Sequence, residues 1–533
     1  MKNILKIGFL LVSMFILMPS CDDYLDKLPD NRAELDSESK VRSLLVSAYP
    51  NATSAMMSEY WSDNWDSHDW NLNYNNYMQD LWELKDQQNR SGNDHTFRTW
   101  ELNYKSIAAC NEVLKKIEEM GNPASLQSAK AEALIARAWN HFELAILFCL
   151  PYGETSSTDM GLPYMKEPET TVKPDYKRGT VEELFKNIEA DIEAGLVDLS
   201  NDMYSQPKFH FNVNAAYAFA TRFYMTYGKF KRAIECANRV LGNDPKQMLR
   251  NWQATTSMSM DNSEQPDAYM AKNNPATLLM SYPTSGWSTS GPNNYSTGNK
   301  YSHSMLVAKY ETLQSSGPWG TYSNFYIRTW WNSNTNKLFH RKIGYYFEYT
   351  DPIARTGYQH TGIVHFTTDE VLLSRAEAYI LTKDYQSAYR DLTTFISNYA
   401  KNTPPTYQSI IDFYKKMQYY HYEEVYKQEM GQDILVQYPT PKKPLHPPLY
   451  QIDYQTDQEW LLHYVLHLRR ILLMGEGQRW LDVKRYGITV HRRLVDKGHK
   501  VVSVSDSIPY NDKRRAMQIP LEIINAGCPA NPR

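Results

Sequence analysis

Residues 215–241 read AAYAFATRFYMTYGKFKRAIECANRVL, and this stretch decides the fold class. Apolar residues recur in it at three- and four-residue spacing, first up to residue 227 and again after residue 229. That period places the apolar side chains on one face of a helix. Gly228 interrupts the pattern, and glycine readily adopts the left-handed backbone that ends a helix. The stretch therefore predicts two helices that pack as a hairpin.

A second stretch, much later in the chain, has the same layout. Residues 372–396 read LLSRAEAYILTKDYQSAYRDLTTFI, and the pattern predicts a helix over 369–381, a short polar turn, and a second helix over 385–398. This layout resembles the tetratricopeptide repeat, whose unit is about 34 residues long. Since the two copies are degenerate and widely separated, a plain helical hairpin is the alternative. Either way, stacked helical pairs form the predicted scaffold.

Further helices precede these pairs. The apolar spacing predicts helices over residues 100–119, 126–150 and 180–199. The third begins with Thr180-Val-Glu-Glu, which has the form of a capping box at a helix start. The first two end at Gly-Asn-Pro and Pro-Tyr-Gly, which are helix-stop signals.

Between the helices lie stretches with a different composition. Residues 59–82, 251–365 and 402–460 are rich in Tyr together with Ser, Asn, Gly, Trp or Pro, and they show no helical period. They are predicted to be long loops with few short strands. Long loops in a compact protein tend to be functional, so these stretches are the place to look for a binding site.

The composition narrows the classes of ligand. The chain has 57 basic and 60 acidic residues, so no strong charge favours nucleic acid as a partner. It has 13 Trp and 40 Tyr against 17 Phe. Trp and Tyr combine a flat apolar face with a polar edge, so their surplus indicates wet aromatic surfaces in addition to a core.

The N-terminus predicts export. Lys2 and Lys6 precede an apolar run over residues 7–18. A positive start followed by an apolar run is the layout of a signal peptide. The run is shorter than the roughly 20 residues that span a bilayer. Ser20 then precedes Cys21, so cleavage between them would leave a cysteine ready to carry lipid. An ordinary signal peptide with an incidental cysteine is the alternative.

Several landmarks occur in one order along the chain. They are Cys21 with DDYLDKLPD, WELNYKSIAACNEVL, AEALIARAWNHFELAILFCLPYG, DEVLLSRAEAYI, MGEGQRWLDVKRYGI and AMQIPLEIINAGCPANP. This series resembles the SusD/RagB family, the starch-utilisation-type outer-membrane lipoproteins, along essentially the whole chain. The ending departs from the family pattern, because the expected Asn-Pro appears only as Asn531-Pro532 and Cys528 intervenes.

The resemblance implies a mainly α fold, in which a tetratricopeptide-like scaffold carries a large loop-rich, Trp/Tyr-rich binding region. The implied regions are a signal peptide (1–20), an N-terminal region (21–250), a loop-rich binding region (251–365) and a C-terminal region (366–533). The implied function is to capture oligosaccharide at the cell surface for a SusC-like TonB-dependent transporter, as its hinged lid. No catalysis or cofactor is implied. A peptide-binding lid of the RagB type is the alternative, and a surface glycoside hydrolase is a more distant one.

Aromatic residues in the loops are the predicted stacking platforms for sugar rings, which have an apolar face and a polar edge. The candidates are Trp65, Trp70, Trp82, Trp287, Tyr295 and Trp319. Polar residues surround the first two and are predicted to bind sugar hydroxyls; they are Asp63, Asn64, Asp66, His68 and Asn71. The platforms are expected to converge on one face. If they do not bind, residues 402–460 are the next region to test.

Other chemistry has weaker support. The sequence contains no Gly-x-Ser-x-Gly, His-Glu-x-x-His or phosphate loop. His463 and His467 share a helix face, but they lack the third ligand that a metal site needs. Cys110, Cys149 and Cys236 fall within apolar helical patterns and are predicted to be core residues.

Overall fold

The computed structural model describes residues 35–70, 74, 76–86, 92–169, 177–259, 263–290, 300–332, 337–429 and 432–533. The predicted signal peptide and Cys21 lie outside these residues. Residues 35–41 belong to an N-terminal unit and carry the start of helix α3 (Glu38–Leu44). Residues 42–533 form a second unit, to which the rest of this account refers.

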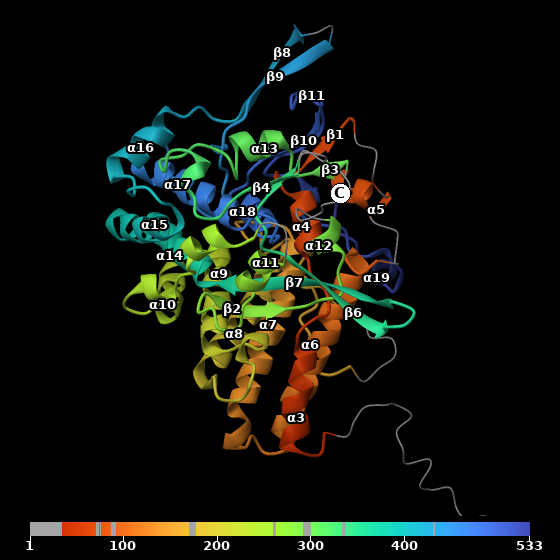
Figure 1. Cartoon of the computed structure of the whole chain (residues 1–533). Helices are drawn as coiled ribbons and strands as arrows, with labels where there is room; N and C mark the ends of the chain where they lie inside the picture. The colour runs from red at the N-terminus through yellow and green to blue at the C-terminus, as the bar shows by residue number, and fades with distance from the viewer. Residues whose placement is uncertain are drawn as a thin grey trace, which may run out of the picture. The chain divides into compact units, whose positions relative to one another are not determined.

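Helical pairs form the scaffold of this unit, as the sequence predicts (Figure 1). α9 (Val213–Tyr227) packs with α10 (Phe230–Leu241), and α14 (Thr368–Leu381) packs with α15 (Tyr385–Tyr399). α10 also contacts α14, so the two pairs are neighbours in space although they are distant in sequence. The scaffold is therefore continuous across the long insertion.

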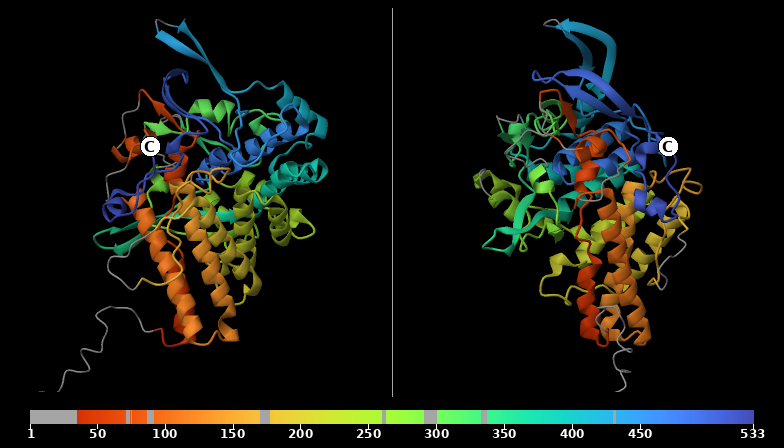
Figure 2. Two further views of the ribbon diagram at one scale, coloured as in Figure 1. Left: turned by 180° about the vertical axis from the view of Figure 1, so that it is seen from behind. Right: turned by 90° about the vertical axis from the view of Figure 1, so that its right-hand side faces the viewer.

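Three longer helices extend the scaffold: α6 (Thr96–Glu119), α7 (Gln127–Phe148) and α8 (Val181–Asp198). α7 packs between the other two, and Figure 2 shows them running side by side. Thr180 and Glu183 form the predicted capping box at the start of α8. α17 (Asp457–Leu472) continues the series beyond α14.

The turn between the helices is the same in both pairs. Gly228 follows α9 with φ of 77°, and Lys383 follows α14 with φ of 65°. Both residues have the left-handed backbone that ends a helix. At Gly228 an added Cβ would lie 2.4 Å from Leu449 Cδ2, the end of a flexible side chain, so the positive φ is the main constraint on substitution there.

Small sheets lie in the loop-rich part. A four-stranded sheet has the order β11-β10-β1-β3, and a three-stranded sheet has the order β2-β7-β6. The strands of the first are β1 (Asp66–His68), β3 (Tyr301–Ser302), β10 (Val490–Val495) and β11 (Val501–Ile508). The strands of the second are β2 (Thr277–Ser281), β6 (Gly344–Asp351) and β7 (Thr356–Thr367). Two hairpins complete the set, β4 (Trp330–Asn332) with β5 (Lys337–Phe339) and β8 (His421–Glu429) with β9 (Gln432–Tyr438).

Shorter helices connect these elements. They are α4 (Ala55–Trp61), α5 (Asn76–Trp82), α11 (Glu264–Tyr269), α12 (Trp287–Ser290), α13 (Met305–Tyr310), α16 (Tyr407–Lys416), α18 (Arg479–Arg485) and α19 (Leu521–Asn525). In the described part of the chain, no helix combines the length and apolar character needed to cross a membrane.

The prediction of irregular structure over residues 402–460 is wrong in part. α16 and the β8–β9 hairpin lie in this range, and α17 begins there. α16 was missed because it is short, although Thr406 caps its first turn and Ile410, Ile411 and Tyr414 are buried on one side. Cys110, Cys149 and Cys236 are buried and unpaired, as predicted.

Candidate ligand-binding surface

The early and middle loops meet in space although more than 200 residues separate them. β1 pairs with β3, with Ser67 opposite Tyr301. The Trp65 and Trp287 rings are 5.6 Å apart, and the Trp82 ring stacks on Tyr301 at 5.3 Å. These loops therefore build one aromatic region beside the four-stranded sheet. Trp319 lies elsewhere, against His467 and the helix α17.

Most of the proposed platforms are buried, three of them in this region. Trp65 is 1% exposed, Trp82 is 3% exposed, and Trp287 and Trp319 have no exposed surface. Trp65 stacks on Tyr60 at 4.6 Å, and the Trp287 indole nitrogen donates to the Gly475 carbonyl at 2.8 Å. A ring without an exposed face cannot stack on a sugar, so these four tryptophans are core residues in this structure. Tyr295 lies outside the described residues.

The polar residues around Trp65 are buried as well, because charged residues from the C-terminal part pair with them. We call the paired set the ionic cluster; it consists of Asp63, Asp66, Glu311, Lys443, Arg470, Arg479 and Arg493. Arg479 binds the Asp63 carboxylate at 2.7 Å, and Arg493 binds that of Asp66 at 2.6 Å. The predicted role of Asp63 and Asp66 as readers of sugar hydroxyls is therefore wrong, and Asn71 lies outside the described residues.

Glu311 is at the centre of the ionic cluster. The Lys443 ammonium lies 2.5 Å from its carboxylate, and Arg470 and Arg493 each approach to 2.9 Å. Burial alone would raise the pKa of Glu311, but the three cations outweigh it and hold that pKa well below its usual value. The cluster thus joins the early loop to residues 443–493 by charged contacts.

The segment MGEGQRWLDVKRYGI (474–488) also bonds to buried carboxylates of other parts of the chain. Gly475 and Gly477 donate their backbone N–H groups to Glu59 at 3.1 and 2.9 Å. Arg485 binds Glu377 at 2.6 Å, so the MGEGQRWLDVKRYGI segment contacts the RAEA segment of α14 directly. Trp480 in this segment is fully buried.

One aromatic candidate reaches the surface. Trp70 is half-buried and lies two residues after β1; its ring centre is 4.5 Å from that of His68 and 6.4 Å from that of His499. Tyr74 is 38% exposed, and the Lys300 ammonium lies 4.6 Å from the centre of its ring. We call Trp70, Tyr74, Lys300 and His499 the Trp70 patch. It offers aromatic faces and hydrogen-bond donors at the end of the four-stranded sheet where β1 and β10 end and β3 begins.

Sequence reasoning named Trp70 but missed the other members of the patch. Tyr74 lies in the same loop-like stretch, residues 59–82, and its neighbours Asn73 and Asn75 were the signal that could have found it. Lys300 and His499 had no such signal, because the strand order β11-β10-β1-β3 alone places their segments beside the early loop.

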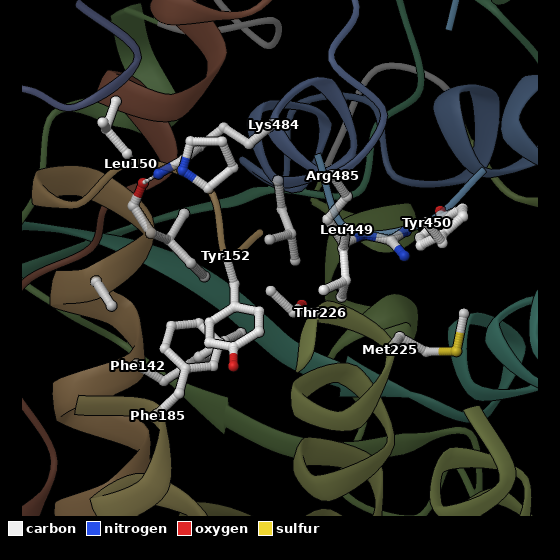
Figure 3. A pocket seen from close by; sticks show the side chains of 14 residues that line it. Phe142, Leu150, Tyr152, Phe185, Met225, Thr226, Leu449, Tyr450, Lys484 and Arg485 are labelled. Atoms are coloured by element: carbon white, nitrogen blue, oxygen red, sulfur yellow. Dashed lines mark hydrogen bonds between the residues drawn. The ribbon is translucent and has the colours of Figure 1, made fainter. Parts of the chain in front are cut away.

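A cavity between α7, α8 and α9 was a second candidate (Figure 3). Phe142, Tyr152 and Phe185 line one side, and Lys484 donates to the Ile146 carbonyl at 2.8 Å. Its volume of about 20 Å³ is room for a single water molecule and no more. The cavity is therefore a packing defect of the core rather than a ligand site.

Metal binding has no support among the described residues, where no group of three His, Cys, Asp or Glu side chains comes together. His467 instead contacts the Ser315 hydroxyl at 2.7 Å and the Tyr414 hydroxyl at 2.9 Å. His463 lies 3.6 Å from the Glu459 carboxylate. Both histidines are buried core residues, as the sequence favoured.

Comparison with known proteins gives the context for this surface. Residues 23–225 match the SusD-like family described as "Starch-binding associating with outer membrane". A comparison with curated proteins found no match.

Solved structures share the fold at low sequence identity. A SusD superfamily protein from Bacteroides thetaiotaomicron is 17% identical, with a TM-score of 0.61 over 92% of this chain and 98% of its own. A putative sugar binding protein from Bacteroides vulgatus is 18% identical, with a TM-score of 0.62 over 93% and 98%. A SusD-like carbohydrate binding protein from the same species is 15% identical, with a TM-score of 0.59 over 92% and 96%.

These relatives carry the same helical scaffold along nearly their whole length. The resemblance of the motifs, the match of residues 23–225 and the shared fold agree with one another. Residues 23–225 are therefore similar to the SusD-like family, and most of the chain shares the fold of solved SusD superfamily proteins.

Proposed function

We propose that this protein is a cell-surface lipoprotein that binds oligosaccharide and delivers it to a partner TonB-dependent outer-membrane transporter. The observation that carries the proposal is the Trp70 patch on a scaffold whose relatives are described as sugar or carbohydrate binding proteins. Trp70 and Tyr74 supply apolar faces for sugar rings, and Lys300 and His499 supply polar groups beside them.

Binding without turnover is part of the proposal. A glycoside hydrolase needs a pair of carboxyl groups that flank the scissile bond. Asp63 and Asp66, the early-loop carboxylates nearest Trp65, are instead held in ion pairs with Arg479 and Arg493. They support the packing of the loop rather than acid–base chemistry.

The test is calorimetry with a panel of oligosaccharides and with peptides as the alternative cargo. We expect binding to one glycan class, with no shorter products after prolonged incubation. Trp70→Ala should weaken binding by roughly five- to a hundred-fold, by analogy with the stacking of bases on aromatic residues. Tyr322→Ala is the matched control, because Tyr322 is 42% exposed and lies outside the patch. Binding of peptides alone, or release of shortened glycan, would contradict the proposal.

Attachment to the membrane is tested separately at Cys21. Cys21→Ala should abolish labelling with palmitate and release the protein from the outer-membrane fraction. If the variant fractionates and labels like the wild type, the anchor lies elsewhere. Co-purification with the barrel of a TonB-dependent transporter tests the partner, and its absence from membrane extracts under mild detergent would argue against delivery by this route.

A further inference from the structure

An open groove lies outside the aromatic region, where three segments of the chain meet. They are the turn after α7 (150–159), the segment before α17 (446–454) and the residues after β11 (510–513). The groove has a volume of about 490 Å³, within the range of roughly 300–1,000 Å³ that is usual for small-molecule sites. It shares no residue with the Trp70 patch.

Backbone contacts hold the three segments in place. The Glu154 N–H donates to the Pro448 carbonyl at 3.1 Å, and the His446 N–H donates to the Tyr486 carbonyl at 2.7 Å. Gly487 has φ of 58°, and a Cβ there would lie 2.1 Å from the His446 carbonyl oxygen. Because only glycine fits at this close approach, the groove is a built feature of the fold and needs no rearrangement to form.

Two tyrosines present their rings to the groove. Tyr510 is 51% exposed, and its ring lies 4.8 Å from that of His446 at an angle of 32°. Tyr454 is 46% exposed, and its hydroxyl donates to the Leu445 carbonyl at 2.5 Å, which fixes the ring. Oriented aromatic faces with about half of their surface exposed are suited to the apolar face of a sugar ring.

Polar side chains stand beside these rings without partners of their own. Within the described residues, Glu154, Gln451, Asn511 and Lys513 line the groove and make no side-chain hydrogen bond or ion pair. Together they offer a carboxylate, two amides and an ammonium group, which can accept from and donate to hydroxyl groups. A few polar groups that converge on an aromatic surface are typical of a site that fixes the orientation of a ligand.

The charge of the lining restricts the class of ligand. Glu154, Asp159 and Asp512 are acidic, whereas Lys513 is the one basic side chain among the lining residues other than His446. Asp159 accepts from Thr155 at 2.6 Å, and Asp512 pairs with Arg514 at 2.7 Å. The excess of carboxylates opposes an anionic ligand such as a uronic acid oligosaccharide.

We infer that this groove is a second saccharide-binding site, which prefers neutral oligosaccharides to acidic ones. The inference rests on the proposed function, since it assumes that the protein binds glycans. In it, Tyr510 and Tyr454 hold sugar rings while Glu154, Gln451 and Asn511 bind their hydroxyls. A second site on a separate surface would let one molecule hold a long glycan at two points, which raises the overall affinity without new contacts.

The experiment uses the mature chain and four hexasaccharides, which are maltohexaose, mannohexaose, xylohexaose and hexagalacturonate. Calorimetry measures affinity and stoichiometry for the wild type, Trp70→Ala, Tyr510→Ala and Glu154→Gln. Tyr358→Ala is the matched control, because Tyr358 is 56% exposed and lies on β7, away from the groove residues. Thermal unfolding of each variant shows whether it is folded.

We expect at least one neutral hexasaccharide to bind Trp70→Ala, and hexagalacturonate not to bind it. Tyr510→Ala should weaken that remaining binding on the order of ten-fold, and Glu154→Gln, which preserves the shape of the groove, several-fold. Tyr358→Ala should bind like the wild type.

Three results would overturn the inference. If Tyr510→Ala and Glu154→Gln bind every hexasaccharide like the wild type, the groove is not a site, while the proposed function stands. If Trp70→Ala abolishes all binding, the patch is the sole site. If the wild type binds none of the four and binds no glycan of the wider panel, the proposed function fails and the groove inference fails with it.

Discussion

The two ends of the early loop differ in their surroundings although they have the same composition. Trp65 lies between Asp63 and Asp66, whose carboxylates are drawn inward by Arg479 and Arg493. Trp70 follows β1 by two residues and remains half-buried beyond the end of this central strand. The difference teaches that an aromatic residue among polar neighbours becomes a surface platform only when those neighbours have no buried charge to pair with.

The largest expected effect comes from the ionic cluster, which creates this difference. Glu311→Gln should lower the free energy of unfolding by about 3–5 kcal/mol, because it leaves three buried cations short of one carboxylate. Urea denaturation measures the change. Glu235→Gln is the control; Glu235 is exposed, pairs with Arg232, and should lose less than about 1 kcal/mol. Equal losses in the two variants would show that the cluster does not hold the loop.

The contrast between the tryptophans is tested next, by substitution on each side. Trp287→Ala should lower the free energy of unfolding by about 3–5 kcal/mol, because it leaves a large cavity in the aromatic core. Trp70→Ala should cost about 1 kcal/mol or less. Glycan affinity, measured on the folded fraction, should show the opposite: Trp70→Ala should lose more affinity than Trp287→Ala. A Trp287→Ala variant that keeps its stability but loses binding would restore Trp287 as a platform.

The smallest expected effect is a dependence of stability on pH that arises inside the scaffold. Lys484 donates to the Ile146 and Cys149 carbonyls, and burial lowers its pKa from 10.5 to about 7. Between pH 7 and 10.5 the folded protein therefore holds Lys484 neutral while the unfolded chain holds it charged. Since the unfolded state binds the extra proton, stability rises with pH in this window, by about 1.4 kcal/mol per pH unit from this group.

Lys484→Met removes this contribution. Between pH 7.5 and 9.5, the free energy of unfolding measured with urea should rise more, or fall less, for the wild type than for Lys484→Met. Lys231→Met is a control on the surface of α10, where no such difference is expected. If the two pH slopes of wild type and Lys484→Met coincide, Lys484 does not change its charge on folding in this range.

Helix prediction succeeded where local periodicity was strong. The helices expected over 214–227 and 180–199 occur within one residue of those limits, because apolar spacing and caps act within a few turns of chain. Residues 407–416 were missed, since ten residues between two loops carry too little of the period. The landmark motifs resemble those of the SusD/RagB family, and a solved SusD superfamily protein shares the fold.

The sequence by itself determined the helical scaffold and the loops in which aromatic and polar residues gather. It also predicts an export signal. Only the tertiary structure decided which of those aromatics face solvent. Burial at Trp65 depends on Arg479 and Arg493, which are more than 400 residues away, and the groove at Tyr510 forms from three separate segments. Such contacts arise from the way the chain returns on itself, and local sequence patterns carry no information about them.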